Sequence, residues 1–146
     1  MSTLPGLSHS ARYALSAMVV LGRLREDERI STVDLAHQAG VPDAFLAKLL
    51  RQLGKHDLLD GQKGHHGGYR LARPPQSIPL MMVLHGLEEG DVHAPTECAM
   101  GVRPCNPQKP CLLHHRWSAA IQPMLDMLST MTVADLAFNK AHESSE

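Results

Sequence analysis

Residues 31–53 read STVDLAHQAGVPDAFLAKLLRQL, and this stretch decides the fold. Ser31 and Asp34 form a Ser-x-x-Asp variant of the capping box, which predicts the start of a short helix. Gly40 is placed to end that helix, and Pro42 suits the first turn of a second one. Two helices joined by a tight, glycine-containing turn are typical of a helix-turn-helix unit. The second helix has an apolar face at Phe45, Leu46, Leu49, Leu50 and Leu53.

Residues 58–71 add the pattern of a wing. The segments LLD (58–60) and YRL (69–71) flank the glycine-rich stretch GQKGHHGG (61–68). Two short strands around such a tip predict a β-hairpin. Lys63, His65 and His66 place hydrogen-bond donors on the tip, and Gly67 allows the backbone to approach another surface closely. The chain up to residue 73 is therefore predicted to be a winged helix-turn-helix unit.

Helical patterns flank this unit on both sides. A first helix is predicted from a cap at Ser8 or Ser10, ending in the charged stretch 25–29. Pro74-Pro75 ends the winged unit, and apolar spacing predicts a helix over 77–88. A proline- and glycine-rich loop is expected over 89–110, and a long helix over about 112–129, kinked at Pro123. Thr132 and Asp135 predict the start of a short last helix.

The composition fits one mainly helical domain. The 146 residues are 43% hydrophobic and 20% charged, but only 3% aromatic, which favours packed helices over a β-sandwich. The net charge of -1 is unevenly spread: residues 1–73 hold ten Lys/Arg and seven Asp/Glu, and residues 74–146 hold four and eight. The first half is thus the basic one, as a polyanionic partner such as DNA requires.

The sequence also bears on location and redox state. The start MSTLPGLSHS lacks the pattern of a secretory signal, and no apolar run approaches a membrane span, so we expect a cytoplasmic protein without a membrane partner. Thiols stay reduced in that compartment. The 3 Cys residues are odd in number and fall together between positions 98 and 111, so a disulfide framework is not expected.

These cysteines form the pattern Cys98-x6-Cys105-x5-Cys111-x2-His114 within the predicted loop. Three thiolates and an imidazole suit zinc or an iron-sulfur cluster, and unligated surface thiols are the plain alternative. An enzyme with a Cys nucleophile paired to His114 or His115 is the remote alternative. Such chemistry needs a nucleophile held rigidly beside a base and an oxyanion site, which nothing here supplies, so we expect no enzyme.

The chain resembles the Rrf-two family of bacterial winged-helix regulators over roughly positions 7–138. The resemblance lies in the segment RYAL (12–15), the AGV turn (39–41), the GGYRLARP stretch (67–74) and the three-cysteine loop. It is strongest toward the IscR- and NsrR-like iron-sulfur branch. The resemblance implies a fold class that is mainly α with a small β-hairpin wing, namely a winged helix-turn-helix unit (1–73) plus a long C-terminal dimerisation helix. It assigns residues 74–146 to a cluster-binding loop (89–114) and dimerisation helices.

The resemblance also implies a function and a set of ligands. It indicates a homodimeric regulator that reads double-stranded DNA at a palindromic operator and senses iron-sulfur, redox or nitric-oxide status through a cluster. Cys98, Cys105, Cys111 and His114 match the ligand positions, with a 2Fe-2S cluster favoured and a 4Fe-4S cluster as the alternative. The gap between Cys98 and Cys105 is one residue longer than in the better-known members. A thiol- or zinc-based DNA-binding regulator without a cluster is the second hypothesis.

Positions matching the recognition helix and the wing give the expected DNA contacts. Base reading is expected mainly from Lys48 and its neighbours, and phosphate contacts from Arg51, Lys63 and the glycine-rich backbone. For the lysine and arginine side chains, an ordinary solvated helix face is the alternative. The expected DNA-binding residues are Ala44, Lys48, Arg51, Lys63, His65, His66 and Gly67.

Overall fold

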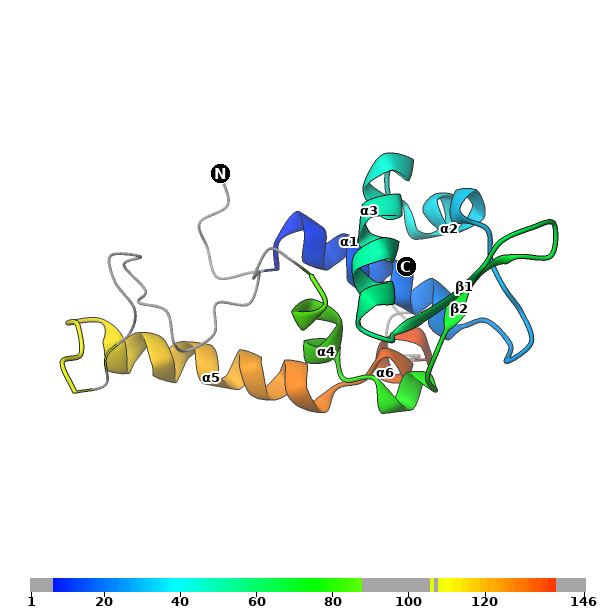
Figure 1. The fold of residues 1–146 in the computed structure, drawn as a ribbon. Helices are drawn as coiled ribbons and strands as arrows, with labels where there is room; N and C mark the ends of the chain where they lie inside the picture. The colour runs from blue at the N-terminus through cyan, green and yellow to red at the C-terminus, as the bar shows by residue number, and fades with distance from the viewer. Residues whose placement is uncertain (1–6, 88–105, 107, 139–146) are drawn as a thin grey trace, which may run out of the picture.

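The computed structural model describes residues 7–87, 106 and 108–138 (Figure 1). Its described part is mainly helical with one two-stranded antiparallel hairpin, which confirms the predicted fold class. Most of the expected loop over 89–110, with Cys98 and Cys105, lies outside the described residues. The elements are α1 (His9–Gly22), α2 (Thr32–Ala39), α3 (Asp43–Lys55), β1 (Leu59–Gln62), β2 (Gly68–Leu71), a 3-10 turn η1 (Pro75–Ser77), α4 (Leu80–His85), α5 (His114–Thr130) and α6 (Val133–Phe138).

The helix-turn-helix unit forms where the capping residues predict it. The Ser31 hydroxyl accepts a hydrogen bond from the Asp34 amide at 3.1 Å and so caps α2. Gly40 ends α2 in the left-handed conformation, with φ 67°, which a residue with a side chain adopts at a cost. The buried Val41 follows, and α3 then starts after Pro42. The turn residues therefore set the angle between the two helices.

The wing is a hairpin tied to the segment before α2. β1 and β2 pair with Asp60 opposite Arg70 and Gly61 opposite Tyr69. Ile30 adds an isolated bridge to β2: its amide donates to the Tyr69 carbonyl at 3.0 Å, and the Tyr69 amide donates back at 2.8 Å. Gly68 makes this approach feasible, because it has φ 129° and a Cβ there would lie 2.5 Å from the Ile30 carbonyl oxygen.

Two helices are shorter than the sequence patterns predict. α1 ends at Gly22, before the charged stretch 25–29, because the chain must turn and extend for Ile30 to pair with Tyr69. The helix expected over 77–88 begins only at Leu80, since Pro79 disfavours a helical residue before it. Ile78 is extended instead, with φ -111° and ψ 95°. α5 runs through Pro123 as one helix (Figure 1).

The segments before α4 and before α6 lie side by side. Pro79 pairs with Thr132, the Leu80 amide donates to the Met131 carbonyl at 2.9 Å, and the Val133 amide donates to the Ile78 carbonyl at 2.9 Å. The predicted capping box at Thr132 is confirmed, because its amide donates to the Asp135 carboxylate at 2.8 Å.

This junction brings α6 onto α1. The Arg23 guanidinium also donates to the Ala137 carbonyl at 2.8 Å. As a result one hydrophobic core contains side chains from both halves of the chain, among them Met18, Leu46, Leu53, Ile78, Leu84, Leu128 and Val133.

The close approach at Gly68 gives a first prediction. We expect Gly68→Ala to lower the free energy of unfolding by about 1–3 kcal/mol, because a methyl group would press on Ile30 at an unfavourable φ. Gly64→Ala is the matched control, since Gly64 also has a positive φ, 108°, but no heavy atom lies within 4 Å of its Cβ position. Urea denaturation measures both, and equal losses would contradict the role of the Ile30 contact.

Candidate nucleic-acid interface and cysteine segment

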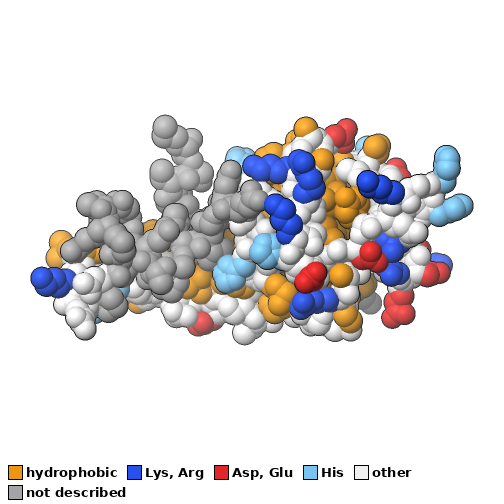
Figure 2. Space-filling view, in the orientation of Figure 1, with side chains coloured by type: hydrophobic (Ala, Val, Ile, Leu, Met, Phe, Trp, Pro, Cys, Tyr) orange, Lys and Arg blue, Asp and Glu red, His pale blue; other side chains and the backbone are white. Residues whose placement is uncertain are grey.

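α3 separates its buried side chains from its polar ones. Its leucines enter the core, and Phe45 packs edge-on against Tyr13 of α1, with 5.2 Å between ring centroids. The opposite face is solvent-exposed and carries Lys and Arg side chains, which gather over α3 in Figure 2. This face combines small side chains with cations, as a helix that enters a DNA groove requires. The exposed residues of α3 are Asp43, Ala44, Ala47, Lys48, Arg51, Gly54 and Lys55.

The tip of the wing is equally exposed. Lys63, His65 and His66 all lie in solvent, and Figure 2 shows histidine side chains at the outer end of the hairpin. Gly67 is half-buried, and its amide donates to the Gly64 carbonyl at 3.0 Å to close the turn. A Cβ on Gly67 would collide with the Gln62 carbonyl oxygen. The hairpin itself therefore needs this glycine, whatever else the backbone contacts.

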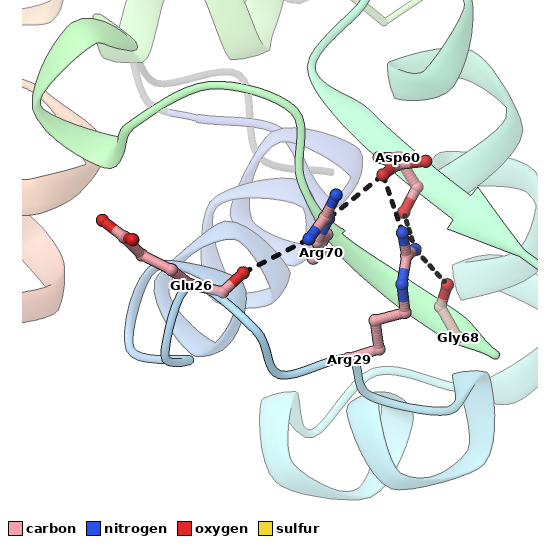
Figure 3. Close-up of polar contacts among 5 residues, drawn as sticks. All are labelled: Glu26, Arg29, Asp60, Gly68 and Arg70. Carbon is pink, nitrogen blue, oxygen red and sulfur yellow. Dashed lines mark hydrogen bonds and ion pairs between the residues drawn. The ribbon is translucent and has the colours of Figure 1, made fainter. Parts of the chain in front are cut away.

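The base of the wing holds an ionic cluster that the sequence analysis missed (Figure 3). Asp60 of β1 lies 2.8 Å from the Arg29 guanidinium and 3.0 Å from that of Arg70. The hydrogen bond from Arg29, and after it that from Arg70, lowers the pKa of the Asp60 carboxyl below its ordinary value. The pairing of Asp60 with Arg70 follows from the hairpin register, whereas nothing in the sequence points to Arg29.

The described end of the cysteine segment lies directly before α5. Cys111 and His114 are both half-buried, and the His114 amide donates to the Cys111 carbonyl at 3.1 Å. His115 is exposed, with 5.2 Å between the two histidine rings. In the parts of the chain that the structure describes, no group of three or more His, Cys, Asp or Glu side chains is placed to hold a metal. Cys98 and Cys105 lie outside those parts.

The donor set fits a soft metal or a cluster. Cys111 and His114 bring a sulfur and a nitrogen ligand within one turn of chain, and the sequence adds two further thiols. Such ligands suit zinc or iron-sulfur clusters and not hard cations.

A helix-turn-helix with an exposed basic helix face and a wing defines a winged-helix DNA-binding protein. The family model described as "Iron-dependent Transcriptional regulator" matches residues 7–139. The chain belongs to this family, Rrf2, and is a DNA-binding transcriptional regulator. The family and its named members are transcriptional regulators and not enzymes, as predicted. Within the described residues no helix is long and apolar enough to cross a membrane.

Several curated proteins are similar over most of the chain. Protein rrf2 of Nitratidesulfovibrio vulgaris is 34% identical, over 89% of this chain and 85% of its own length. The regulator NsrR of Geobacillus kaustophilus is 30% identical, over 92% and 91%. The regulator IscR of Pectobacterium carotovorum is 28% identical, over 92% and 80%. The resemblance to the IscR- and NsrR-like relatives is thereby confirmed.

Solved structures share the fold. CymR of B. subtilis, described as a global cysteine regulator, superposes with a TM-score of 0.75 at 21% identity, covering 92% of this chain and 97% of that one. IscR of T. potens gives a TM-score of 0.75 at 20% identity, covering 97% and 92%. These likenesses establish the winged-helix fold of the chain.

The lowered pKa of Asp60 gives a second prediction. Folding lowers the pKa of this carboxyl group, so the ionised group stabilises the protein fully at pH values above its ordinary pKa, 3.8. This stabilisation is lost as the pH falls through the lower pKa of the folded state. We therefore expect Asp60→Asn to have a lower Tm than wild type at neutral pH, with the gap narrowing below pH 3.8. Asp27→Asn, an exposed acid before Arg29, is the matched control. If the Tm of Asp27→Asn differed from wild type by the same amount and with the same pH dependence, the stabilising role of the Asp60 ion pairs would be contradicted.

Proposed function

We propose that this regulator senses iron-sulfur, redox or nitric-oxide status through a cluster held by Cys98, Cys105, Cys111 and His114. The observation that carries the proposal is the position of Cys111 just before α5, and of His114 at its first residue, in a chain that belongs to a family of DNA-binding regulators. The similarity to IscR and NsrR proteins supports the same assignment. A 2Fe-2S cluster is favoured, and a 4Fe-4S cluster is the alternative.

DNA is read by α3 and the wing together. The small side chain of Ala44 lets α3 approach the major groove closely, and Lys48 reaches base edges. Arg51 and Lys63 neutralise phosphates and so hold the domain in register. On the tip, His65 and His66 donate hydrogen bonds to the backbone or the adjacent groove, and Gly67 keeps the hairpin narrow enough to enter.

The protein acts as a cytoplasmic homodimer on a palindromic operator. Each winged unit contacts one half-site, because a two-fold protein matches a two-fold DNA sequence. α5 supplies the dimer contact. It extends away from the winged unit in Figure 1 and carries exposed apolar side chains, with Met127 46% exposed and Leu113, just before the helix, 42% exposed.

Cys111 and His114 are coupled to the DNA-binding unit through the packing of the helices. His114 is the first residue of α5, and Leu125 and Leu128 bury the far end of that helix. α5 packs on α4, and Gly86, just after α4, lies so close to α3 that a Cβ there would be 3.2 Å from Leu53. A shift of α5 would therefore move α4 and change the packing of α3, the helix proposed to read DNA. When bound, the cluster supplies a centre that reacts with oxidants and nitric oxide.

Anaerobic purification with iron, sulfide and zinc analysis and Mössbauer spectra tests the sensor. We expect iron and inorganic sulfide together. Zinc alone, or thiols without metal after reconstitution, would overturn the cluster and favour the thiol- or zinc-based regulator.

Single substitutions test the ligands. We expect Cys111→Ala and His114→Ala to lose iron while keeping their helical circular dichroism. His115→Ala, which removes the neighbouring exposed imidazole, should keep its iron. Full iron content in the Cys111 variant would show that the ligand assignment is wrong.

The salt dependence of DNA binding tests the role of Lys63. We expect Lys63→Ala to weaken binding to duplexes of any sequence and to reduce the slope of log affinity against log salt by about one unit, as for one lost phosphate contact. Arg116→Ala removes the same charge from an exposed position on α5 and should leave both quantities unchanged. Wild-type slope and affinity in the Lys63 variant would remove this residue from the interface.

A further inference from the structure

The wing-base cluster, defined as Arg29, Asp60 and Arg70, joins three segments of the chain (Figure 3). Arg29 precedes α2, Asp60 lies in β1 and Arg70 lies in β2. One carboxylate oxygen of Asp60 accepts hydrogen bonds from both guanidinium groups, at 2.8 and 3.0 Å. Charge-assisted bonds of this length are the stronger class of hydrogen bond.

Both arginines also bind backbone on the far side of the junction. The second terminal nitrogen of Arg29 donates to the carbonyls of Asp60, at 3.1 Å, and Gly68, at 3.3 Å, and so spans both strands. Arg70 donates in the opposite direction, to the Glu26 carbonyl at 3.3 Å. The loop between α1 and α2 and the hairpin therefore hold each other from both sides.

These bonds lie where the orientation of the wing is set. The side chain of Arg29 is only 15% exposed, so it is engaged with the hairpin and not with solvent. Its neighbour Ile30 pairs with Tyr69, and Ser31 then caps α2. The tip from Lys63 to His66 is exposed, so the fixed base determines where Lys63 points relative to α3.

We propose that Asp60, Arg29 and Arg70 are positioning residues for DNA binding: they hold the wing at the angle at which its tip and α3 contact one duplex. This inference rests on the proposed contacts of α3 and the wing with DNA. Arg29 and Arg70 belong to the basic half of the chain, but both pair with Asp60. In this proposal they act on DNA binding through the hairpin and do not contact DNA themselves.

The substitution Asp60→Asn distinguishes this positioning role from an effect of net charge on DNA affinity. Asp60→Asn removes a negative charge, so the net charge alone predicts tighter binding to a polyanion. Loss of the wing's orientation predicts weaker binding instead. Because the two expectations have opposite signs, the direction of the change in affinity decides between them.

The experiment uses the full chain and a short labelled duplex of arbitrary sequence, titrated at several salt concentrations. We expect Asp60→Asn to weaken binding by about tenfold, the size usual for residues coupled in one network, and to flatten the salt dependence as Lys63→Ala does. In the double variant, Lys63→Ala should add little to Asp60→Asn. Tighter binding by Asp60→Asn, or additive losses in the double variant, would overturn the inference.

A second pair of variants guards against loss of folding in Asp60→Asn. Arg70→Gln removes one arm of the cluster and leaves the Arg29–Asp60 pair in place. Arg25→Gln removes the same charge from a side chain that is 85% exposed and that pairs with Glu28 in the same loop. With circular dichroism showing both folded, we expect weaker binding for Arg70→Gln than for Arg25→Gln. Equal binding would overturn the positioning role.

Hydrogen exchange without DNA separates failure of this inference from failure of the proposed function. We expect the amides of β2 (Gly68–Leu71) to exchange faster in Asp60→Asn than in wild type, because Arg29 and Arg70 lose their shared acceptor. Unchanged exchange would overturn the inference even where wild type binds DNA. Wild-type protein that binds no duplex at all would overturn the proposed DNA contacts, while the exchange rates would still decide whether the cluster holds the wing.

Discussion

The two backbone hydrogen bonds between Ile30 and Tyr69 are the constraint on which the DNA-binding unit depends. They fix the hairpin to the segment that enters α2, and so link the wing to the helix-turn-helix. Gly68 has to be a glycine for this pairing to form, since a side chain would meet the Ile30 backbone. The wing-base cluster adds charged side chains to the same junction. Backbone pairing thus sets the distance between wing and helices, and the ion pairs restrict the remaining rotation.

A second backbone junction links the segments before α4 and α6 and so ties the C-terminal helices to the core. The extended residues around Pro79 and Thr132 pair, and this pairing brings α6 against α1 and leaves α5 to extend from the core. The N-terminal end of α5 carries His114, with Cys111 three residues before it, whereas the opposite end of the helix is anchored in the core near Leu128. The boundary predicted at residue 73 stays a prediction, and side chains from both sides of it pack into one hydrophobic core.

The sequence predicts those features that depend on local chemistry. Capping residues such as Ser31 and Thr132 locate helix starts because their partners lie three residues away. Gly40 and the glycine-rich tip locate turns for the same reason. Pro79 is a local signal of the same kind, and it accounts for the start of α4 at Leu80 instead of Ser77. The contact of Arg29 with Asp60 spans 31 residues, so it depends on tertiary structure that no local pattern encodes. The ligand role proposed for the cysteines rests on the family resemblance, because their spacing alone suits several ligands.

The charge of the first half has a different meaning once the ion pairs are known. Its ten Lys and Arg residues include Arg29 and Arg70, which are committed to Asp60, and Arg23, which binds the Ala137 carbonyl. Among the other seven, Lys48, Arg51 and Lys63 are the ones proposed to contact DNA. Because only Arg51 and Lys63 are proposed to contact phosphates, one subunit alone would bind with weak, salt-sensitive affinity. In the proposed homodimer, two subunits on one operator would double that number and add a second set of base contacts. The proposed homodimer would therefore supply affinity that one subunit lacks, and a change in the position of α5, the proposed dimer helix, would alter that affinity.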